Sequence, residues 1–157
     1  MKPSNAACGR GIKMVTKDTK IRNRKDYLVS EYIRNPHLIN DLKYDLRIYV
    51  LVSSYDPLRV YMFEEGLVRF ATHKYTTKLK EVKKRFIHLT NFSVNKHSKM
   101  FVKNKEADED GQGSKWSLTA LKSYYQSIGI DSVAVRSMLY VAVRTHQGNH
   151  HQDLHGC

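Results

Sequence analysis

The sequence predicts a mixed fold of the α/β (α+β) class, with an antiparallel sheet and flanking helices. In the first half of the chain, strand-like runs of alternating side chains are separated by short turns. In the second half, apolar residues recur at helical spacing instead. Because 41% of the 157 residues are hydrophobic, the chain has enough apolar side chains to bury a core.

The first element is a loop of small residues from Lys2 to Ile12, which contains Gly9 and Gly11. Glycine allows backbone N–H groups to come close to a phosphate, although a turn between two strands is the commoner reason for isolated glycines. A strand is expected over Tyr27–Ile33, ending at the Asn35–Pro36 pair.

The most informative segment is the strand expected over Lys43–Val52. Alternate residues of a strand share a face. One face is expected to pack in the core and consists of Tyr44, Leu46, Ile48, Val50 and Val52. The other face begins with Lys43, Asp45 and Arg47. Three successive charges on one face of an apolar strand suggest a binding site, although a solvated sheet face is the commoner explanation for such a pattern.

Two more strands follow, over Leu58–Phe63 and Leu67–Thr72, with turns expected at Ser53–Pro57 and Glu64–Gly66. This antiparallel meander puts Arg69 on a strand near the one that carries Asp45 and Arg47. Whether these side chains converge is left open by the sequence.

The next elements are a strongly basic segment, Thr76–Arg85, and a short buried segment, Phe86–Phe92. A flexible loop is expected over residues 95–113. A helix is predicted from an N-cap at Ser114 to Ser127, with Gly129 at its end and Trp116 on its apolar stripe. A second helix would begin at Asp131.

After Arg144 the sequence becomes polar and rich in histidine. Five of its side chains could ligate zinc on paper, namely His146, His150, His151, His155 and Cys157. The near absence of apolar residues favours a disordered tail over residues 145–157 instead, so no metal site is predicted.

Composition limits the possible partners and compartments. The net charge of +12 is concentrated in residues 1–105, which hold 23 Lys and Arg against 9 Asp and Glu, and it implies an anionic partner. The longest apolar run, Ile48–Val52, is too short to span a bilayer, so no membrane partner is expected. No apolar segment follows Met1, which favours the cytosol or nucleus, and the two cysteines suggest no disulfide framework.

A composite of motifs then becomes recognisable in the order KP…GRGI, LVSEYI, KYDLRIYVLVSSYDPLRVY, EEGLVRFAT, HLTNFSVNK and SKWS. From Lys2 to Arg144 the sequence resembles the tubulin tyrosine ligase-like family, and within it the branch that ligates glutamate onto tubulin. The resemblance implies a partial ATP-grasp fold, with the end of the central lobe at 1–31, part of the C-terminal lobe at 32–144 and a divergent tail at 145–157.

The same resemblance implies an ATP-dependent ligase that uses magnesium. Such enzymes phosphorylate a carboxylate to an acylphosphate, which the amine of an incoming amino acid attacks. The expected substrates are glutamate and the acidic tails of tubulin, and the expected locations are the cytoplasm and cytoskeleton, with the cilium and basal body as candidates.

Residue roles are also implied by the resemblance. Arg47 and Arg69 are expected to be catalytic, and an Arg fork is independently suited to gripping a carboxylate. Nucleotide contacts are expected at Lys2, Cys8, Gly9, Ser30, Glu31, Tyr32, Ile33, Lys43, Tyr44, Asp45, Thr90 and Asn91. Substrate contacts are expected at Arg69, Phe92, Ser93 and Lys115.

Three departures from the family pattern shape these expectations. Cys8 replaces a residue that is usually basic, and Phe92 replaces a tyrosine. The family's magnesium ligands lie beyond the equivalent of Arg144, where this sequence diverges. We therefore expect an incomplete catalytic domain that neither completes a metal site nor catalyses by itself.

Two other function classes remain to be weighed. A non-catalytic fragment that binds tubulin or microtubules would use Thr76–Arg85 as an electrostatic clamp. A nucleic-acid binder is disfavoured, because the aromatic residues are expected to pack in the strands rather than to stack on bases.

Overall fold

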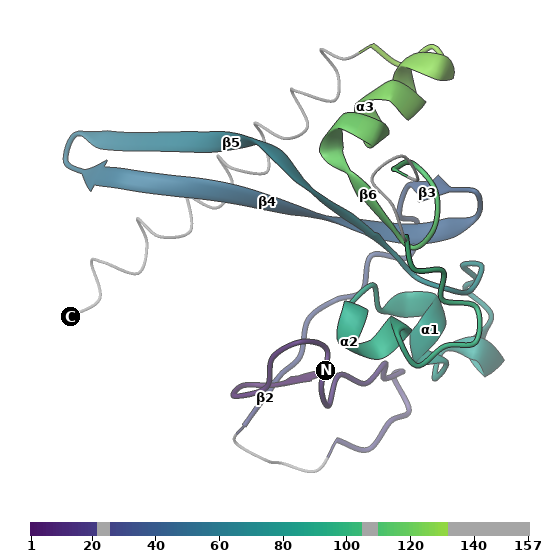
Figure 1. Cartoon of the computed structure of the whole chain (residues 1–157). Helices are drawn as coiled ribbons and strands as arrows, with labels where there is room; N and C mark the ends of the chain where they lie inside the picture. Colours follow the sequence, from purple (N-terminus) through teal and green to yellow (C-terminus); the bar gives the residue numbers. More distant parts are fainter. Residues whose placement is uncertain (22–25, 105–109, 132–157) are drawn as a thin grey trace. The chain divides into compact units, whose positions relative to one another are not determined.

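A computed structural model describes residues 1–21, 26–104 and 110–131 (Figure 1). It confirms the mixed fold class with antiparallel strands and short helices, as a partial ATP-grasp fold requires. The chain divides into two compact units, residues 1–117 and a second unit that begins at Leu118. The second helix expected from Asp131 and the histidine-rich tail lie outside the described residues.

The strands of the first unit form two antiparallel sheets. The small sheet pairs β1 (Lys2–Pro3) with β2 (Tyr27–Leu28). The larger sheet has the order β3-β4-β5-β6, made of β3 (Leu38–Ile39), β4 (Leu42–Tyr55), β5 (Leu58–Phe70) and β6 (Lys115–Ser117). The strand expected over Tyr27–Ile33 is therefore wrong beyond Leu28, because β1 offers only two residues for pairing.

A long hairpin of β4 and β5 dominates the larger sheet (Figure 1). The turn predicted at Glu64–Gly66 is wrong, since β5 runs unbroken through these residues and Gly66 pairs with Ile48. The register shifts between Ile48 and Val50, so an irregularity in the ladder absorbs the glycine without ending the strand. Cross-strand pairing thus overrides a local turn signal.

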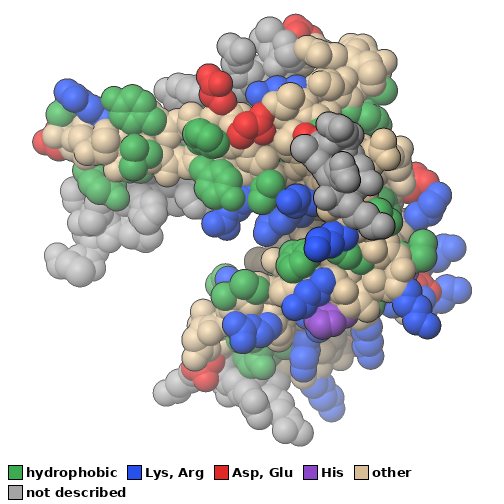
Figure 2. Space-filling view, in the orientation of Figure 1, with side chains coloured by type: hydrophobic (Ala, Val, Ile, Leu, Met, Phe, Trp, Pro, Cys, Tyr) green, Lys and Arg blue, Asp and Glu red, His purple; other side chains and the backbone are tan. Residues whose placement is uncertain are grey.

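The core of the sheet lies on one face, at the inner end of this hairpin. Val68 and Phe70 are 0% and 3% exposed, and the rings of Phe70 and Trp116 lie 4.8 Å apart. The prediction that Val50 and Val52 are core residues is wrong, because their exposed fractions are 43% and 38%. The neighbouring strands β3 and β6 pair only with the inner end of the hairpin. Hydrophobic side chains consequently show on the outer part of the hairpin (Figure 2).

Short helical turns follow the hairpin. They comprise η1 (Leu79–Glu81), α1 (Arg85–His88) and α2 (Phe92–Asn95). Ile87, His88 and Val94 are buried, as expected for the segment around Phe86–Phe92. Asn95 contradicts the prediction that a flexible loop begins there, because it ends α2 and is 1% exposed.

The helix expected from Ser114 begins later. Residues Lys115–Ser117 form β6 and pair with the edge of β5, and α3 spans Leu118–Ser127. The Ser114 hydroxyl accepts a hydrogen bond from the backbone N–H of Val102 at 3.1 Å, so it does not cap the helix. Trp116 accordingly lies in the sheet.

The second unit is described here only for α3 and the residues that follow it. The helix ends at Ser127 as predicted, and Gly129 has a φ of 78°. The backbone N–H of Ile130 donates to the carbonyl of Tyr125 at 2.8 Å, which satisfies an acceptor at the helix end. No helix among the described residues has the length and apolar character that would cross a membrane.

Candidate functional site

A charged face of the larger sheet carries five of the residues predicted for the nucleotide and amino-acid sites. Lys43, Asp45 and Arg47 alternate along β4 and therefore share this face. Asp45 lies directly opposite Arg69 of β5, and Arg69 lies opposite Lys115 of β6. The register thus settles the convergence that the sequence left open, because three strands place these five charges side by side.

The centre of the face is an ion pair between Arg69 and Asp45. The Arg69 Nε donates to Asp45 Oδ1 at 3.0 Å, and its Nη2 donates to Asp45 Oδ2. The hydrogen bond to Asp45 raises the pKa of Arg69 despite an opposing effect of burial. The two side chains remain 26% and 37% exposed, so they sit in a partly open position.

Two further cations of this face are more open to solvent. Arg47 is exposed, and its guanidinium lies 5.6 Å from the ring centroid of Tyr49. Lys115 is also exposed. Together with Arg69 they form a cationic surface with which a carboxylate or phosphate could pair.

A second cluster joins the segment around Tyr32 to the sheet. The Lys43 Nζ donates to the hydroxyl of Tyr32 at 3.3 Å and to the carbonyl of His88 at 3.1 Å, and the Tyr32 hydroxyl contacts His88 Nδ1 at 3.0 Å. Burial lowers the pKa of Lys43, and the charge of Asp45 partly offsets that effect. Burial also lowers the pKa of His88, which favours its neutral imidazole.

Burial raises the pKa of Tyr32 far above its ordinary value, with a further contribution from Tyr75. Its phenol therefore stays neutral. The side chains of Lys43, Tyr32 and His88 are thus joined by consecutive hydrogen bonds.

The glycine loop contacts the start of α2. Arg85 Nη2 donates to the carbonyl of Gly9 at 3.0 Å, and the Ser93 hydroxyl donates to the carbonyl of Cys8. Gly9 has a φ of 77°, and a Cβ there would lie 2.6 Å from Asn91 Oδ1. The fold thus brings together four residues of the predicted site, Cys8, Gly9, Asn91 and Ser93.

Asn95 organises this region and was missed as a site residue. Its Oδ1 accepts from the backbone N–H and the hydroxyl of Thr72, at 3.1 and 3.0 Å. Its Nδ2 donates to the carbonyls of Leu89 and Asn91, at 2.7 and 3.1 Å. Asn95 thereby ties the segment that carries Thr90 and Asn91 to the end of β5. An asparagine between Val94 and Lys96 gives no sequence signal of this role.

The remaining predicted residues lie elsewhere. Lys2 is exposed on β1, while Ser30, Glu31 and Ile33 are exposed in the segment after β2. Tyr44 lies on the face of β4 opposite to Lys43 and Asp45, where its ring packs 5.8 Å from that of Phe70. Thr90 is buried, and Phe92 is 59% exposed with its ring edge against Phe101.

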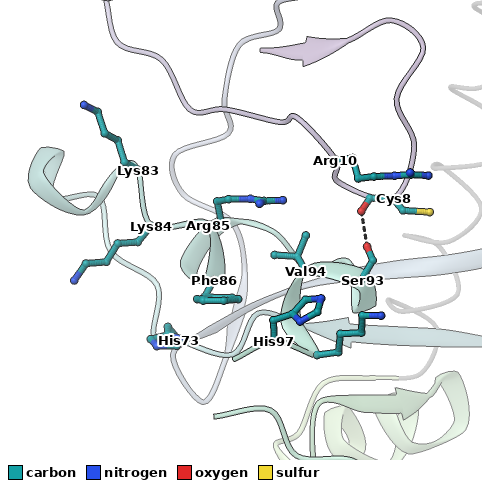
Figure 3. A pocket seen from close by; sticks show the side chains of 11 residues that line it. Cys8, Arg10, His73, Lys83, Lys84, Arg85, Phe86, Ser93, Val94 and His97 are labelled. Carbon is teal, nitrogen blue, oxygen red and sulfur yellow. Dashed lines mark hydrogen bonds between the residues drawn. The ribbon is translucent and has the colours of Figure 1, made fainter. Parts of the chain in front are cut away.

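A cationic cavity of about 790 Å³ opens beside the glycine loop (Figure 3). Its lining combines basic, aromatic and small side chains from Cys8, Arg10, His73, Lys83, Lys84, Arg85, Phe86, Ser93, Val94, Lys96 and His97. Five of these are Lys or Arg and none is Asp or Glu. Figure 3 shows Arg85 extending toward the segment of Cys8 and Arg10, and Lys and Arg side chains are prominent in this region in Figure 2. The size suits a ligand of small-molecule dimensions, and the lining suits an anion.

The basic segment Thr76–Arg85, weighed from the sequence only as an electrostatic clamp, contributes Lys83, Lys84 and Arg85 to this cavity. Sequence reasoning missed Lys96, His73 and His97, which converge on the cavity only through the tertiary fold. Among residues 1–21, 26–104 and 110–131, no group of three or more His, Cys, Asp or Glu side chains is placed to hold a metal ion.

The amino-acid sequence of this chain is similar to those of several known proteins. The chain is 44% identical over 135 residues to tubulin polyglutamylase TTLL5 of Homo sapiens, which covers 86% of this chain and 10% of that protein. It is 47% identical over 136 residues to tubulin monoglutamylase TTLL4 of Mus musculus, covering 86% and 11%. It is 40% identical over 133 residues to tubulin polyglutamylase ttll-5 of Caenorhabditis elegans, covering 84% and 18%.

The chain therefore spans between 10% and 18% of the length of these three relatives. The sequence profile of the tubulin-tyrosine ligase family matches residues 1–151, which include every site residue described above. The agreement of this profile with the relatives means that the chain belongs to the tubulin-tyrosine ligase family.

Proposed function

We propose that the chain is part of a tubulin polyglutamylase, an ATP-dependent ligase that adds glutamate to glutamate side chains of tubulin tails. The observation that carries the proposal is the charged face of the larger sheet. Lys43, Arg47, Arg69 and Lys115 lie on that face together with the carboxylate of Asp45. Such an excess of cations suits a reaction in which carboxylates and phosphates meet.

The proposed reaction has two steps. The terminal phosphoryl group of ATP passes to a carboxylate oxygen of the acceptor glutamate, and ADP leaves. The amine of free glutamate then attacks the acyl carbon, phosphate leaves, and the nitrogen loses a proton as the amide forms. Both steps concentrate negative charge, which fixed guanidinium and ammonium groups stabilise.

We assign the amino-acid substrate to Arg69, with Arg47 beside it and Lys115 and Ser93 nearby. A guanidinium can hold a carboxylate through two parallel hydrogen bonds, whereas a lysine offers a point charge. The exposure of Arg47 and Lys115 leaves both accessible to a ligand.

We assign the nucleotide to the region of Lys43, Tyr32 and the glycine loop. ATP, with magnesium, would supply the phosphoryl group that activates the acceptor. The lowered pKa of Lys43 supports this assignment in part, because a buried ammonium gains from an anionic partner. The cytoplasm and the microtubule cytoskeleton, including cilia, are the proposed setting.

The test is a binding and turnover comparison of two Arg→Lys variants on the same strand. Arg69→Lys should lower glutamate affinity by about tenfold or more, because it loses the fork. It should lower ATP-dependent incorporation of labelled glutamate into tubulin to the same extent where this segment is part of a complete catalytic domain. Arg59→Lys, at the far end of β5, is the matched control and should change neither. Equal effects of both variants, or none from Arg69→Lys, would contradict the proposed site.

The cationic cavity favours a second candidate, a non-catalytic contact with tubulin through its acidic tails. Arg10, Lys83, Lys84 and Lys96 contribute charges to this cavity, which has no carboxylate in its lining. Attraction of this kind is screened by salt within about 8 Å at physiological ionic strength. Salt sensitivity is therefore a required property of the contact.

Co-sedimentation with microtubules separates the two candidates. Lys83→Gln with Lys96→Gln should weaken binding to intact microtubules, and removal of the acidic tails should have the same effect. Lys17→Gln removes an exposed lysine outside the cavity and should leave binding unchanged. Tail-dependent binding in a protein that binds no glutamate would favour the non-catalytic role.

A further inference from the structure

We propose that His88 is a positioning residue for the nucleotide, and that it acts by holding the phenol of Tyr32 against the ammonium group of Lys43. Neither the sequence motifs nor the family resemblance assigned a role to His88. The inference rests on the proposed function, because it takes the ligand beside Lys43 to be ATP.

His88 is a buried support for Tyr32. It ends α1 and is 4% exposed, so packing fixes its imidazole as well as hydrogen bonding. Its Nδ1 forms a hydrogen bond with the Tyr32 hydroxyl at 3.0 Å, and the two rings meet edge to face with their centroids 5.5 Å apart. The ring of Tyr75 packs edge to face on the same imidazole, with a centroid distance of 5.9 Å. The half-buried Tyr32 is thus attached to a side chain that is itself held on several sides.

Tyr32 and His88 together orient the ammonium group of Lys43. Its Nζ donates to the Tyr32 hydroxyl at 3.3 Å and to the backbone carbonyl of His88 at 3.1 Å, and it lies 4.7 Å from the centroid of the Tyr32 ring. An ammonium group has three N–H donors, so these two bonds leave one for a ligand. The hydroxyl and the carbonyl carry no net charge, and they therefore direct the ammonium without cancelling its attraction for a phosphate.

The bond between His88 and Tyr32 also fixes the segment around Tyr32. Residues 29–37, all of them described, lie outside any strand or helix, so pairing with a neighbouring strand does not position them. Within this segment, Tyr32 is tied to α1 through His88 and to β4 through Lys43. Nucleotide contacts are proposed for both this segment and Lys43. His88 therefore sets the spacing between two parts of the proposed nucleotide site before a ligand binds.

His88→Phe tests the inference, because it removes the bond to Tyr32 and keeps an aromatic ring in the same place. The backbone carbonyl that accepts from Lys43 remains in this variant. We expect ATP affinity to fall by about fivefold, the size of one net hydrogen bond, while glutamate affinity stays within about twofold. An equal fall in both affinities, as a purely structural role would cause, overturns the inference, and so does an unchanged ATP affinity.

Two further histidine variants calibrate that result. His88→Asn should retain more ATP affinity than His88→Phe, because its amide places a polar group close to the position of Nδ1; the reverse order would contradict the role of the hydrogen bond. His37→Phe is the matched control, since His37 also bonds a tyrosine through Nδ1, the exposed Tyr44 hydroxyl at 3.1 Å, with the two rings at 86°. Tyr44 lies on the face of β4 opposite to Lys43, so this variant should leave both affinities unchanged. A loss of ATP affinity as large as that in His88→Phe would refute the inference.

A double-mutant cycle tests whether His88 acts through Tyr32. Tyr32→Phe removes the hydroxyl and keeps the ring beside the Lys43 ammonium. In this background, His88→Phe should cause no further loss of ATP affinity, because the bond that it removes is already absent. A second loss of about fivefold would show that His88 acts independently of Tyr32 and would overturn the inference.

A measurement without ligand separates the inference from the proposed function. The ¹⁵N resonances of imidazole nitrogens respond to hydrogen bonding at each nitrogen. In Tyr32→Phe the Nδ1 resonance of His88 should shift, while that of His37 should stay in place. ATP binding by the wild type together with an unchanged His88 resonance refutes the inference alone, whereas a wild-type protein that binds no ATP refutes the proposed function. This experiment substitutes no histidine, so it remains decisive if His88→Phe fails to fold.

Discussion

Removal of the Asn95 side chain should destabilise the protein far more than its single amide suggests. Asn95 is 1% exposed, and its four hydrogen bonds connect Thr72 at the end of β5 to the carbonyls of Leu89 and Asn91. In Asn95→Ala the backbone N–H of Thr72 and the carbonyl of Leu89 both lose a partner in a buried region.

The magnitude follows from those two groups. A buried polar group that loses its partner costs about 1–3 kcal/mol, so two such groups predict a loss of about 2–6 kcal/mol in the free energy of unfolding. The carbonyl of Asn91 adds little, because it also accepts from the backbone N–H groups of Val94 and Asn95 at 3.0 Å each. A loss of about 4 kcal/mol, in the middle of that range, would be large compared with the total free energy of unfolding of a typical domain.

Urea unfolding followed by circular dichroism measures this loss. Thr72→Val is the matched variant, since it removes only the hydroxyl that bonds Asn95 and His73 and leaves the backbone N–H paired. It should cost about 1 kcal/mol. Hydrogen exchange gives a local readout, because the Thr72 amide should be protected in the wild type and in Thr72→Val but exposed to exchange in Asn95→Ala.

Two results would refute the reasoning. One is a change of less than about 0.5 kcal/mol in Asn95→Ala, the size of an ordinary surface substitution. The other is an equal loss in Asn95→Ala and Thr72→Val, which would mean that the amide does not anchor the two carbonyls. Under the proposed function, ATP affinity should also fall with the local order of Thr90 and Asn91.

Three further predictions concern the backbone, a titrating side chain and the core. Gly9→Ala should lower the melting temperature and loosen the glycine loop more than Gly129→Ala, because only the Cβ at Gly9 meets neighbours, while both positions have a positive φ; equal shifts in thermal unfolding would contradict this. Burial lowers the pKa of His88, so on acidification this imidazole takes up a proton in the unfolded chain before it does so in the folded protein. The free energy of unfolding should therefore fall as the pH drops below about 6.5. His88→Gln should flatten this dependence between about pH 7.5 and about pH 5.5, and an unchanged slope would exclude His88 as its source. Trp116→Ala should cost about 3–5 kcal/mol in urea unfolding because Trp116 is 6% exposed, whereas Phe92→Ala, at a position 59% exposed, should cost under about 1 kcal/mol; the reverse order would place the core elsewhere.

Much of the fold follows from local signals in the sequence. The alternation from Lys43 to Val52 identifies a strand and separates its charged face from its apolar face, because neighbouring side chains of a strand must point in opposite directions. Gly129 marks the end of α3, since few other residues accept its backbone conformation. The motif composite also indicates the family, and the family profile confirms it.

Other features depend on residues that are distant in the sequence. The turn expected at Glu64–Gly66 is absent because β4 is long enough to pair with β5 throughout, and Trp116 lies in a strand because the edge of β5 receives it. Val50 and Val52 carry an apolar pattern but remain exposed, since periodicity shows which side chains share a face and not whether another element covers it.

Some features of the candidate site likewise follow from the sequence, and others depend on the tertiary structure. The sequence by itself determined which charges share a face of β4, because that depends only on the geometry of one strand. The tertiary structure decided that Asp45 meets Arg69, that Asn95 anchors the segment of Thr90 and Asn91, and that Lys96 joins Lys83 around a cavity. Each of these contacts requires the register or packing of separate segments, and their relative placement is fixed by the balance of hydrogen bonds and burial over the whole unit.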